Sequence, residues 1–293
     1  MTAAPAAAAA SRPMAGPVAA RLPGDRLHLQ HGPIDLVIGA TGGREAAFAA
    51  AWDRFRTVLP ELVAELGLLR RAAGPRPRGA VARRMHAAVM PHAPAGFITP
   101  MAAVAGAVAD EILAAMRAAA PLSRAYVNNG GDIALWLGPG QAFRAAIATL
   151  AGQVAGHIDL AAGDGIGGIA TSGTGGRSFT LGIADQVTVL AADAAAADAA
   201  ATVIANAVNL PGHPAIARAP ARSLQPDSDL GARLVTTAVG ALTAAEIARA
   251  LDAGAAVARD LAARGLIRAA CLMLRGEVRL ARWPQPAGSL AHA

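Results

Sequence analysis

The chain contains no lysine, and all 26 of its basic residues are arginine. This absence excludes a lysine Schiff base, a lysine general base and a phosphate loop of the Walker type, which needs a lysine. Cysteine is nearly absent as well. Because Cys271 is alone, the chain can form no internal disulfide and no thiolate metal site. Cys271 lies in an apolar run, so we predict an inert thiol in the core.

Aromatic residues make up only 3% of the chain, and no long apolar run is better interpreted as a membrane span than as an alanine-rich amphipathic helix. We therefore predict no membrane partner. Residues 1–22 are rich in alanine and proline and lack the leucine-rich stretch of a signal peptide. We predict a disordered tail over 1–22, one folded domain over 23–283, a second tail over 284–293, and a cytoplasmic protein.

The net charge is +6, from 26 basic residues against 20 acidic ones. A basic chain suggests a nucleic-acid partner, but these arginines are scattered, Tyr126 is the only tyrosine, and no recognition motif accompanies them. We therefore predict no nucleic-acid binding and attribute the excess of arginine and alanine to coding bias. A hydrophobic content of 54% over 293 residues predicts a folded chain with an ample core.

The stretch from 166 to 209 carries the strongest local signals. Residues 166–171 are apolar and β-branched, as expected of a buried strand, and they lead into a glycine-rich loop over 172–177. Glycine permits positive φ and lets successive backbone N–H groups point at a ligand oxygen. Further donors come from Thr171, Ser172, Thr174 and Arg177. The pattern favours an anion-binding loop, and the alternative is an ordinary turn.

Further along the chain, the sequence predicts a strand over 186–190 and a helix that Asp193 caps. On that helix Asp198 and Thr202 are four residues apart and share one face. A carboxylate with a hydroxyl one turn away supplies two of the oxygen ligands that Mg²⁺ prefers. The alternative is that Asp198 is a solvated residue on an alanine-rich helix.

Two strand-like runs, 125–128 and 133–137, are joined by Asn129-Gly130-Gly131-Asp132, which predicts a β-hairpin. Polar groups of this turn gather where the loop 172–177 must also lie. Several adjacent antiparallel strands with flanking helices predict an α+β fold.

Helix signals occur elsewhere in the chain. A helix is predicted to start at Thr99 and Pro100. One face carries small residues, which would let another helix, a ligand or a second subunit of a homodimer approach, and these are Ala103, Gly106, Ala107 and Asp110. Residues 46–71 have helical periodicity, split or kinked at Pro60. Thr243 and Glu246 form a capping box, whereas 211–229 is polar and predicts a surface excursion.

Four blocks of sequence resemble, in order, an uncharacterised family of bacterial and archaeal proteins. They are PMAAVAGAVAD at 100–110, NNGGDI at 128–133, ATSGTGGRSF at 170–179 and ADQVTVLAADAAAADAAAT at 184–202. That family belongs to the ApbE-like superfamily, whose founding members are the FAD:protein FMN transferases. The resemblance covers roughly residues 26–281. It implies an α+β fold with mixed and antiparallel sheets and flanking helices around one ligand cleft.

The resemblance also implies a function and a set of residues. The transferases bind FAD, use Mg²⁺, and move the FMN half onto a threonine of a protein acceptor. Asp198 and Thr202 match the Asp-x-x-x-Thr pattern whose side chains resemble metal ligands. The residues implied to bind FAD or FMN are Asn129, Gly130, Gly131 and Asp132 in the turn, Thr171, Ser172, Gly173 and Thr174 in the loop, and Arg177 after it.

The sequence departs from the transferase pattern in two places. Residues 102–106 read Ala-Ala-Val-Ala-Gly where the transferases carry a Gly-Gly-x-x-Lys-Gly segment. The transferase segment His-Ile-x-Asp-Pro is missing, and Asp185 alone could stand in its place as a catalytic residue.

Three functional hypotheses follow. The first is a transferase-type enzyme that acts with Mg²⁺ on a nucleotide or flavin pyrophosphate. The second is a binding module without transfer chemistry, linked by resemblance to pterin-dependent one-carbon metabolism. The third is an assembly protein with an empty cleft.

Overall fold

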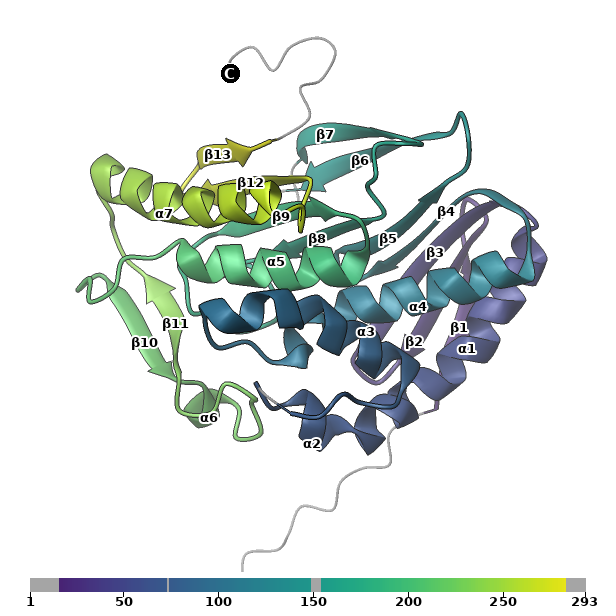
Figure 1. Ribbon diagram of the computed structural model, residues 1–293, viewed down its shortest axis with the longest axis horizontal. Coiled ribbons are helices and arrows are strands. Elements are labelled where there is room, and N and C mark those ends of the chain that lie inside the picture. Colours follow the sequence, from purple (N-terminus) through teal and green to yellow (C-terminus); the bar gives the residue numbers. More distant parts are fainter. Residues whose placement is uncertain (1–15, 73, 149–153, 283–293) are drawn as a thin grey trace, which may run out of the picture.

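The computed structural model describes residues 16–72, 74–148 and 154–282. Its centre is a nine-stranded sheet with the strand order β1-β2-β3-β4-β5-β8-β9-β12-β13 (Figure 1). The strands of this sheet are β1 (Val18–Leu22), β2 (Arg26–His31), β3 (Ile34–Gly42), β4 (Leu122–Asn129), β5 (Asp132–Leu137), β8 (Gly168–Ser172), β9 (Gln186–Ala191), β12 (Ala269–Leu274) and β13 (Glu277–Ala281). Two separate hairpins are formed by β6 (Ala142–Ala148) with β7 (Val154–Ala161) and by β10 (Ile216–Pro220) with β11 (Leu234–Val239).

Helices lie between these strands in the chain. They are α1 (Arg44–Ala64), α2 (Leu66–Leu69), α3 (Ala80–Val89), α4 (Val104–Ala119), α5 (Ala194–Ala207), α6 (Ala221–Leu224) and α7 (Ala244–Ala263), with 3₁₀ turns at Met90–Ala95 and Pro100–Ala103. The predicted α+β class is therefore confirmed. Every described strand pair is antiparallel, so the sheets are antiparallel throughout the described residues. No helix in these ranges is long and apolar enough to cross a membrane.

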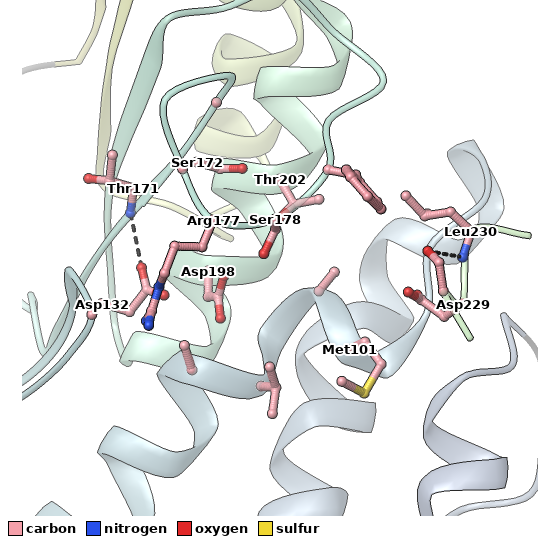
Figure 2. Close-up of a pocket in the computed structure, with 18 of the residues that line it drawn as sticks. Met101, Asp132, Thr171, Ser172, Arg177, Ser178, Asp198, Thr202, Asp229 and Leu230 are labelled. Carbon is pink, nitrogen blue, oxygen red and sulfur yellow. Dashed lines mark hydrogen bonds between the residues drawn. The ribbon is translucent and has the colours of Figure 1, made fainter. Parts of the chain in front are cut away.

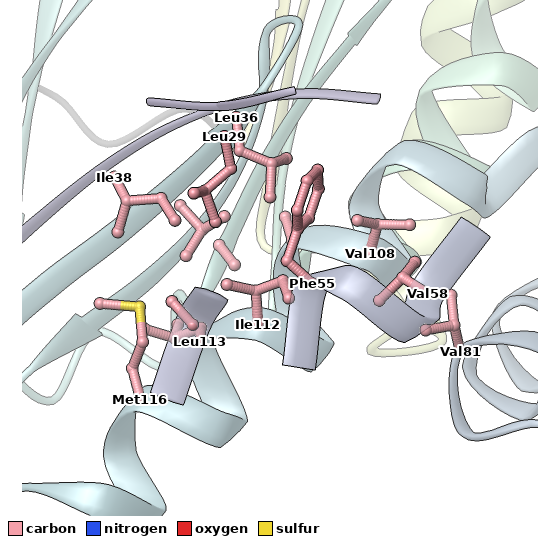
Figure 3. Packing of buried hydrophobic residues seen from close by; sticks show 14 of the residues in the cluster. Leu29, Leu36, Ile38, Phe55, Val58, Val81, Val108, Ile112, Leu113 and Met116 are labelled. Carbon is pink, nitrogen blue, oxygen red and sulfur yellow. The ribbon is translucent and has the colours of Figure 1, made fainter. Parts of the chain in front are cut away.

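The long helices α1, α4, α5 and α7 lie side by side on one face of the sheet (Figure 1). Under α1 and α4, the alternating inward residues of β2 and β3 meet the apolar faces of both helices, as Figure 3 shows for Leu29, Leu36, Phe55 and Ile112. A second cluster lies under α5 and α7. On the opposite face, the β6–β7 hairpin covers the middle strands through Ile158 and Leu160. Burial of these apolar side chains stabilises the fold.

The β4–β5 hairpin has the turn that the sequence predicts. Gly130 and Gly131 form its two central residues, with φ of 63° and 114°, which favour glycine. On its other edge, β5 joins β8 through two residue pairs, Ile133 with Ile169 and Ala134 with Gly168. This short ladder is the junction between the N-terminal and C-terminal halves of the sheet.

The predicted small-residue face on α4 accommodates α5. A Cβ atom at Gly106 would lie 2.2 Å from the carbonyl oxygen of Ala194, and one at Gly168 would lie 2.2 Å from the nitrogen of Ala194. Real Cβ atoms do not approach backbone this closely, so both positions need glycine. The first turn of α5 is therefore held between β8 and α4.

Several local predictions are confirmed. The Asp193 side chain caps α5 by accepting a hydrogen bond from the backbone N–H of Ala196 at 2.8 Å. Thr243 and Glu246 form the predicted capping box of α7.

Other expectations differ from the structure. Residues 18–22, predicted to belong to a disordered tail, form β1, whereas residues 1–15 and the predicted tail over 284–293 lie outside the described residues. Pro60 lies inside α1 without splitting it. The long helix after Pro100 begins at Val104, because a 3₁₀ turn comes first and the Thr99 hydroxyl donates to Asp229 instead of capping. The polar stretch 211–229 contains β10 and α6, so it is part of the folded structure.

Candidate functional site

A cleft of about 560 Å³ opens where the β4–β5 turn, the loop after β8, the start of α4 and the face of α5 that carries Asp198 and Thr202 meet (Figure 2). This volume lies in the usual range for small-molecule sites. Its walls also include residues 225–230, a loop that follows α6. Three loops and two helices that are far apart in the sequence thus surround one space.

Most of the residues singled out in the sequence line this cleft. They are Asn129, Gly130, Asp132, Thr171, Ser172, Gly173, Arg177, Asp198 and Thr202. Gly131, Thr174 and Asp185 lie outside its described lining. The structure brings the predicted residues together, and their binding and catalytic roles remain predictions.

Asp198 lies deep between α5 and the start of α4, but part of its surface is open to the cleft. Its Oδ2 accepts a hydrogen bond from the backbone N–H of Gly106 at 3.1 Å. Burial raises the pKa of this carboxyl well above its ordinary value, and the negative charge of Asp132 raises the pKa further. Hydrogen bonds from Gly106 and Ala105 act in the opposite direction. The solvated Asp198 of the alternative interpretation is therefore not observed.

Asp132 begins β5 and is only 9% exposed. Its Oδ1 accepts a hydrogen bond from the backbone N–H of Thr171 at 3.1 Å, across the short junction between β5 and β8. Burial raises the pKa of Asp132 to about 7, although the Thr171 N–H and the positive charge of Arg177 lower it. Figure 2 shows Asp132, Asp198 and Arg177 facing the same space.

Arg177 lies directly over the β4–β5 turn. A Cβ atom at Gly130 would be 2.1 Å from Nη2 of Arg177, so the guanidinium occupies the volume that a side chain at position 130 would fill. The absence of a side chain at Gly130 therefore serves two purposes, since it permits a positive φ of 63° and makes room for the arginine. This contact ties the loop 172–177 to the hairpin.

Besides Asp132, three of the predicted ligand-binding side chains have partners within the protein. The Thr171 hydroxyl pairs with that of Thr188 at 3.0 Å, and the other two side chains contact carbonyl groups. Asn129 Nδ2 donates to the carbonyl of Ala105 at 3.1 Å and so ties the hairpin to the start of α4. The Thr174 hydroxyl donates to the carbonyl of Ala184 at 3.1 Å. Both contacts position the walls of the cleft.

Three of the backbone N–H groups in the glycine loop donate to the protein itself, which leaves them unavailable to a ligand. Thr174 N–H donates to Ala184, Gly175 N–H donates to Asp185, and Gly176 N–H donates to Gly173, all at carbonyl oxygens of the protein. Hydroxyls of Ser172, Ser178 and Thr202 line the cleft instead (Figure 2). Ser178 was not predicted as a site residue, because a serine after a glycine loop is common and carries no spacing signal.

Asp185 lies behind the glycine loop. Its carboxylate accepts a hydrogen bond from the backbone N–H of Arg275 at the β12–β13 turn, and its own N–H donates to Met273. Its carbonyl is close to Gly173, where a Cβ atom would be only 2.6 Å away. These contacts are structural, and the catalytic role of Asp185 remains a prediction.

The far wall of the cleft is formed by residues 225–230, which the sequence did not predict as part of a site. Most of them lie in the stretch 211–229 that was predicted to be a surface excursion. Asp227 pairs with Arg70 at 2.7 Å, and Asp229 accepts a hydrogen bond from the Thr99 hydroxyl. Leu230 adds apolar surface. Only long-range packing brings these residues to the site, so no local pattern could identify them.

Oxygen donors dominate the cleft. Four aspartates line it, Asp132, Asp198, Asp227 and Asp229, against two arginines. Within the described ranges, no three His, Cys, Asp or Glu side chains are gathered as a metal site. Two carboxylates and the Thr202 hydroxyl could still supply part of the shell of a hard cation, which completes its coordination with ligand and water oxygens.

Comparison with known proteins identifies the family. A family model described as "AbpE bacteria" matches residues 19–280. The chain belongs to this family. Its predicted place in the ApbE-like superfamily is thereby confirmed, and the match begins inside β1, which supports the assignment of that strand to the domain.

Curated relatives of this AbpE family member carry the name UPF0280 protein. The one from Methanothrix thermoacetophila is 39% identical over 136 residues, which cover 44% of this chain and 52% of the relative. The one from Methanothermobacter thermautotrophicus is 40% identical over 121 residues, which cover 39% of this chain and 44% of the relative. The chain thus spans about half the length of the curated relatives it matches.

Solved structures of ApbE proteins are similar to this AbpE family member at low identity. The ApbE protein of Thermotoga maritima is 13% identical, with a TM-score of 0.43 over 87% of this chain and 96% of its own. The flavinyl transferase ApbE of Pseudomonas stutzeri, in its apo form, is 12% identical, with a TM-score of 0.43 over 92% of this chain and 94% of its own.

Proposed function

We propose that the cleft binds a pyrophosphate-containing nucleotide together with Mg²⁺, and that FAD is the first ligand to test. The observation that carries this proposal is the pair of aspartates, Asp132 and Asp198, which face one confined space beside the Thr202 hydroxyl. Two carboxylates that are largely removed from water and repel each other need a cation or a proton between them.

Mg²⁺ fits this donor set. It prefers carboxylate and water oxygens and is commonly held by one or two carboxylates plus substrate phosphates. Asp132, Asp198 and Thr202 would hold the ion, and the bound ion would neutralise phosphate charge. When Asp132 and Asp198 are both ionised, they repel an anionic ligand unless a cation enters with it. The proposal therefore requires that ligand binding depends on Mg²⁺.

Phosphate recognition is assigned to side chains. Arg177 offers a planar fork of N–H donors beside Asp132, and Ser172 and Ser178 offer hydroxyls from the same loop. The choice of a flavin nucleotide rests on membership of the AbpE family and on the four sequence blocks that resemble the ApbE-like superfamily. A protein acceptor and a homodimer remain predictions.

The decisive test is calorimetric titration of the purified protein with FAD, FMN and ADP, each with and without Mg²⁺. We expect FAD to bind only with Mg²⁺, and Asp198→Asn or Thr202→Val to weaken this binding at least tenfold. Asp252→Asn is the matched control, since Asp252 is an exposed carboxylate on α7. Equal binding by wild type and Asp198→Asn, or no binding of any nucleotide, would contradict the proposal.

A second assay separates a transferase from a binding module. Cleavage of the FAD pyrophosphate, with transfer of FMN to an acceptor or to water, releases AMP. AMP in an incubation of FAD, Mg²⁺ and protein, absent with Asp198→Asn, would favour the enzyme. Mg²⁺-dependent binding without AMP would favour the binding module, and an assembly protein would give neither result.

A further inference from the structure

Helices α4 and α5 each supply a carboxylate that accepts hydrogen bonds from backbone N–H groups at the start of the other helix. Asp110, on α4, accepts hydrogen bonds from the first turn of α5, with Oδ1 3.0 Å from Ala194 N and Oδ2 2.9 Å from Ala195 N. Asp198, on α5, accepts one from Gly106 N in the first turn of α4 at 3.1 Å. Each helix therefore satisfies unpaired N–H groups at the start of the other.

We propose that Asp110 is a positioning residue for the cleft: by holding the first turn of α5 against α4, it sets the place of Asp198 and Thr202 opposite Asp132. The inference rests on the proposed function, because it takes Asp198 and Thr202 as cation ligands. Asp110 is outside the described lining of the cleft and acts only through α5.

The geometry leaves α5 little freedom while this contact exists. Asp198 lies one turn after Ala194, so movement of the first turn of α5 moves the carboxylate with it. Gly106 and Gly168 bring the backbone of α4 and β8 against Ala194, which prevents a sideways shift. While Asp110 holds both hydrogen bonds, Asp198 Oδ2 accepts its hydrogen bond from Gly106 of α4, and part of the Asp198 surface remains open to the cleft.

The use of a carboxylate at position 110 is itself informative. Asp110 is 9% exposed, and burial of a carboxylate is unfavourable unless hydrogen bonds or charges compensate it. α5 already has an ordinary N-cap in Asp193, which bonds Ala196. A bidentate contact with Ala194 and Ala195 adds orientation that the single bond of Asp193 does not provide.

The test is Mn²⁺ binding, followed by electron paramagnetic resonance, in wild type, Asp110→Asn and two matched controls. Asp193→Asn removes a negative charge near the same helix end but keeps a good N-cap, since Asn and Asp cap equally well. Thr243→Ala removes the capping box of α7, away from the cleft. Urea unfolding of all four proteins reports stability separately. If Asp110→Asn does not fold, Asp110→Ser takes its place, because serine keeps one acceptor in a smaller side chain.

We expect Asp110→Asn to weaken Mn²⁺ binding at least tenfold and to broaden the spectrum of the bound ion. Asp193→Asn should remain within about twofold of wild type, and Thr243→Ala should lose stability with unchanged Mn²⁺ affinity. Wild-type affinity in Asp110→Asn would overturn the inference and leave the proposed function intact. Equal losses in Asp110→Asn and Asp193→Asn would overturn it in favour of a charge effect. A wild type that binds no Mn²⁺ would overturn the proposed cation site and the inference with it.

Discussion

Replacement of Asp132 by asparagine should stabilise the protein at alkaline pH while it weakens cation binding. The amide oxygen of the introduced asparagine can still accept the hydrogen bond that Thr171 N–H gives to Oδ1. The change removes a charge that burial disfavours, and it removes one of the two negative charges, those of Asp132 and Asp110, that raise the pKa of Asp198. Stability and function should therefore respond in opposite directions, as is common at functional sites.

The magnitude follows from the pKa of Asp132. Burial raises this pKa from 3.8 to about 7, and each unit corresponds to about 1.4 kcal/mol. Because the folded state binds this proton more tightly than the unfolded state, stability decreases as the pH rises from about 4 to about 7 and stays low above that. The penalty is about 1.5 kcal/mol at pH 5 and about 4 kcal/mol at pH 8.

The assay is urea unfolding of wild type and Asp132→Asn at pH 5 and pH 8, with EDTA to remove divalent ions. The free energy of unfolding of the variant relative to wild type should rise by about 2 to 3 kcal/mol between these pH values. Added Mg²⁺ at pH 8 should stabilise wild type more than the variant. A difference that is independent of pH, or that grows on acidification, would refute the reasoning.

Further predictions concern packing, thiol reactivity and the far wall. Gly106→Ala should lower the free energy of unfolding in urea by about 1–3 kcal/mol or more, because its Cβ would strike the backbone of α5. Gly67→Ala, in α2, has open space around the new Cβ and should raise the free energy of unfolding by about 0.5–1 kcal/mol. Burial raises the pKa of Cys271 to about 11, so the native thiol should not react with a disulfide reagent at pH 8 and should react fully in urea. Arg70→Ala should cost less than about 1 kcal/mol in the same urea assay, because its ion pair with Asp227 is partly exposed to water.

Equal urea midpoints for Gly106→Ala and wild type would show that α4 and α5 can separate at little cost. Rapid labelling of native Cys271 would show that β12 opens locally. A loss above about 2 kcal/mol in Arg70→Ala would mean that this ion pair behaves as a buried one.

Features that depend on local chemistry were predictable from the sequence. The turn at Gly130 and Gly131 needs positive φ, and the capping side chains of Asp193 and Thr243 act on N–H groups three residues away. Such signals extend over a few residues and need no knowledge of the fold. The same holds for the spacing of Asp198 and Thr202, which fixes their common helix face and placed both at the cleft.

Features that depend on long-range packing were not predictable in this way. The glycine loop was expected to offer free N–H groups, but Thr174 and Gly175 donate to carbonyls that become neighbours only when β9 pairs with β8. Asp110 looked like one more residue on a small-residue face until the start of α5 was seen against it. The wall at 225–230 is brought to the cleft by a hairpin outside the main sheet.

The short ladder between β5 and β8 has a consequence for how the domain unfolds. It joins the two halves of the sheet through two residue pairs, with the larger buried clusters on either side, and the bond from Thr171 N–H to Asp132 extends it to the edge of the cleft. A molecule bound by Asp132 from one half and by Arg177 or Asp198 from the other would span this junction. Hydrogen exchange should then show two cooperative units of different stability in the free protein, and a single unit once the cleft is filled.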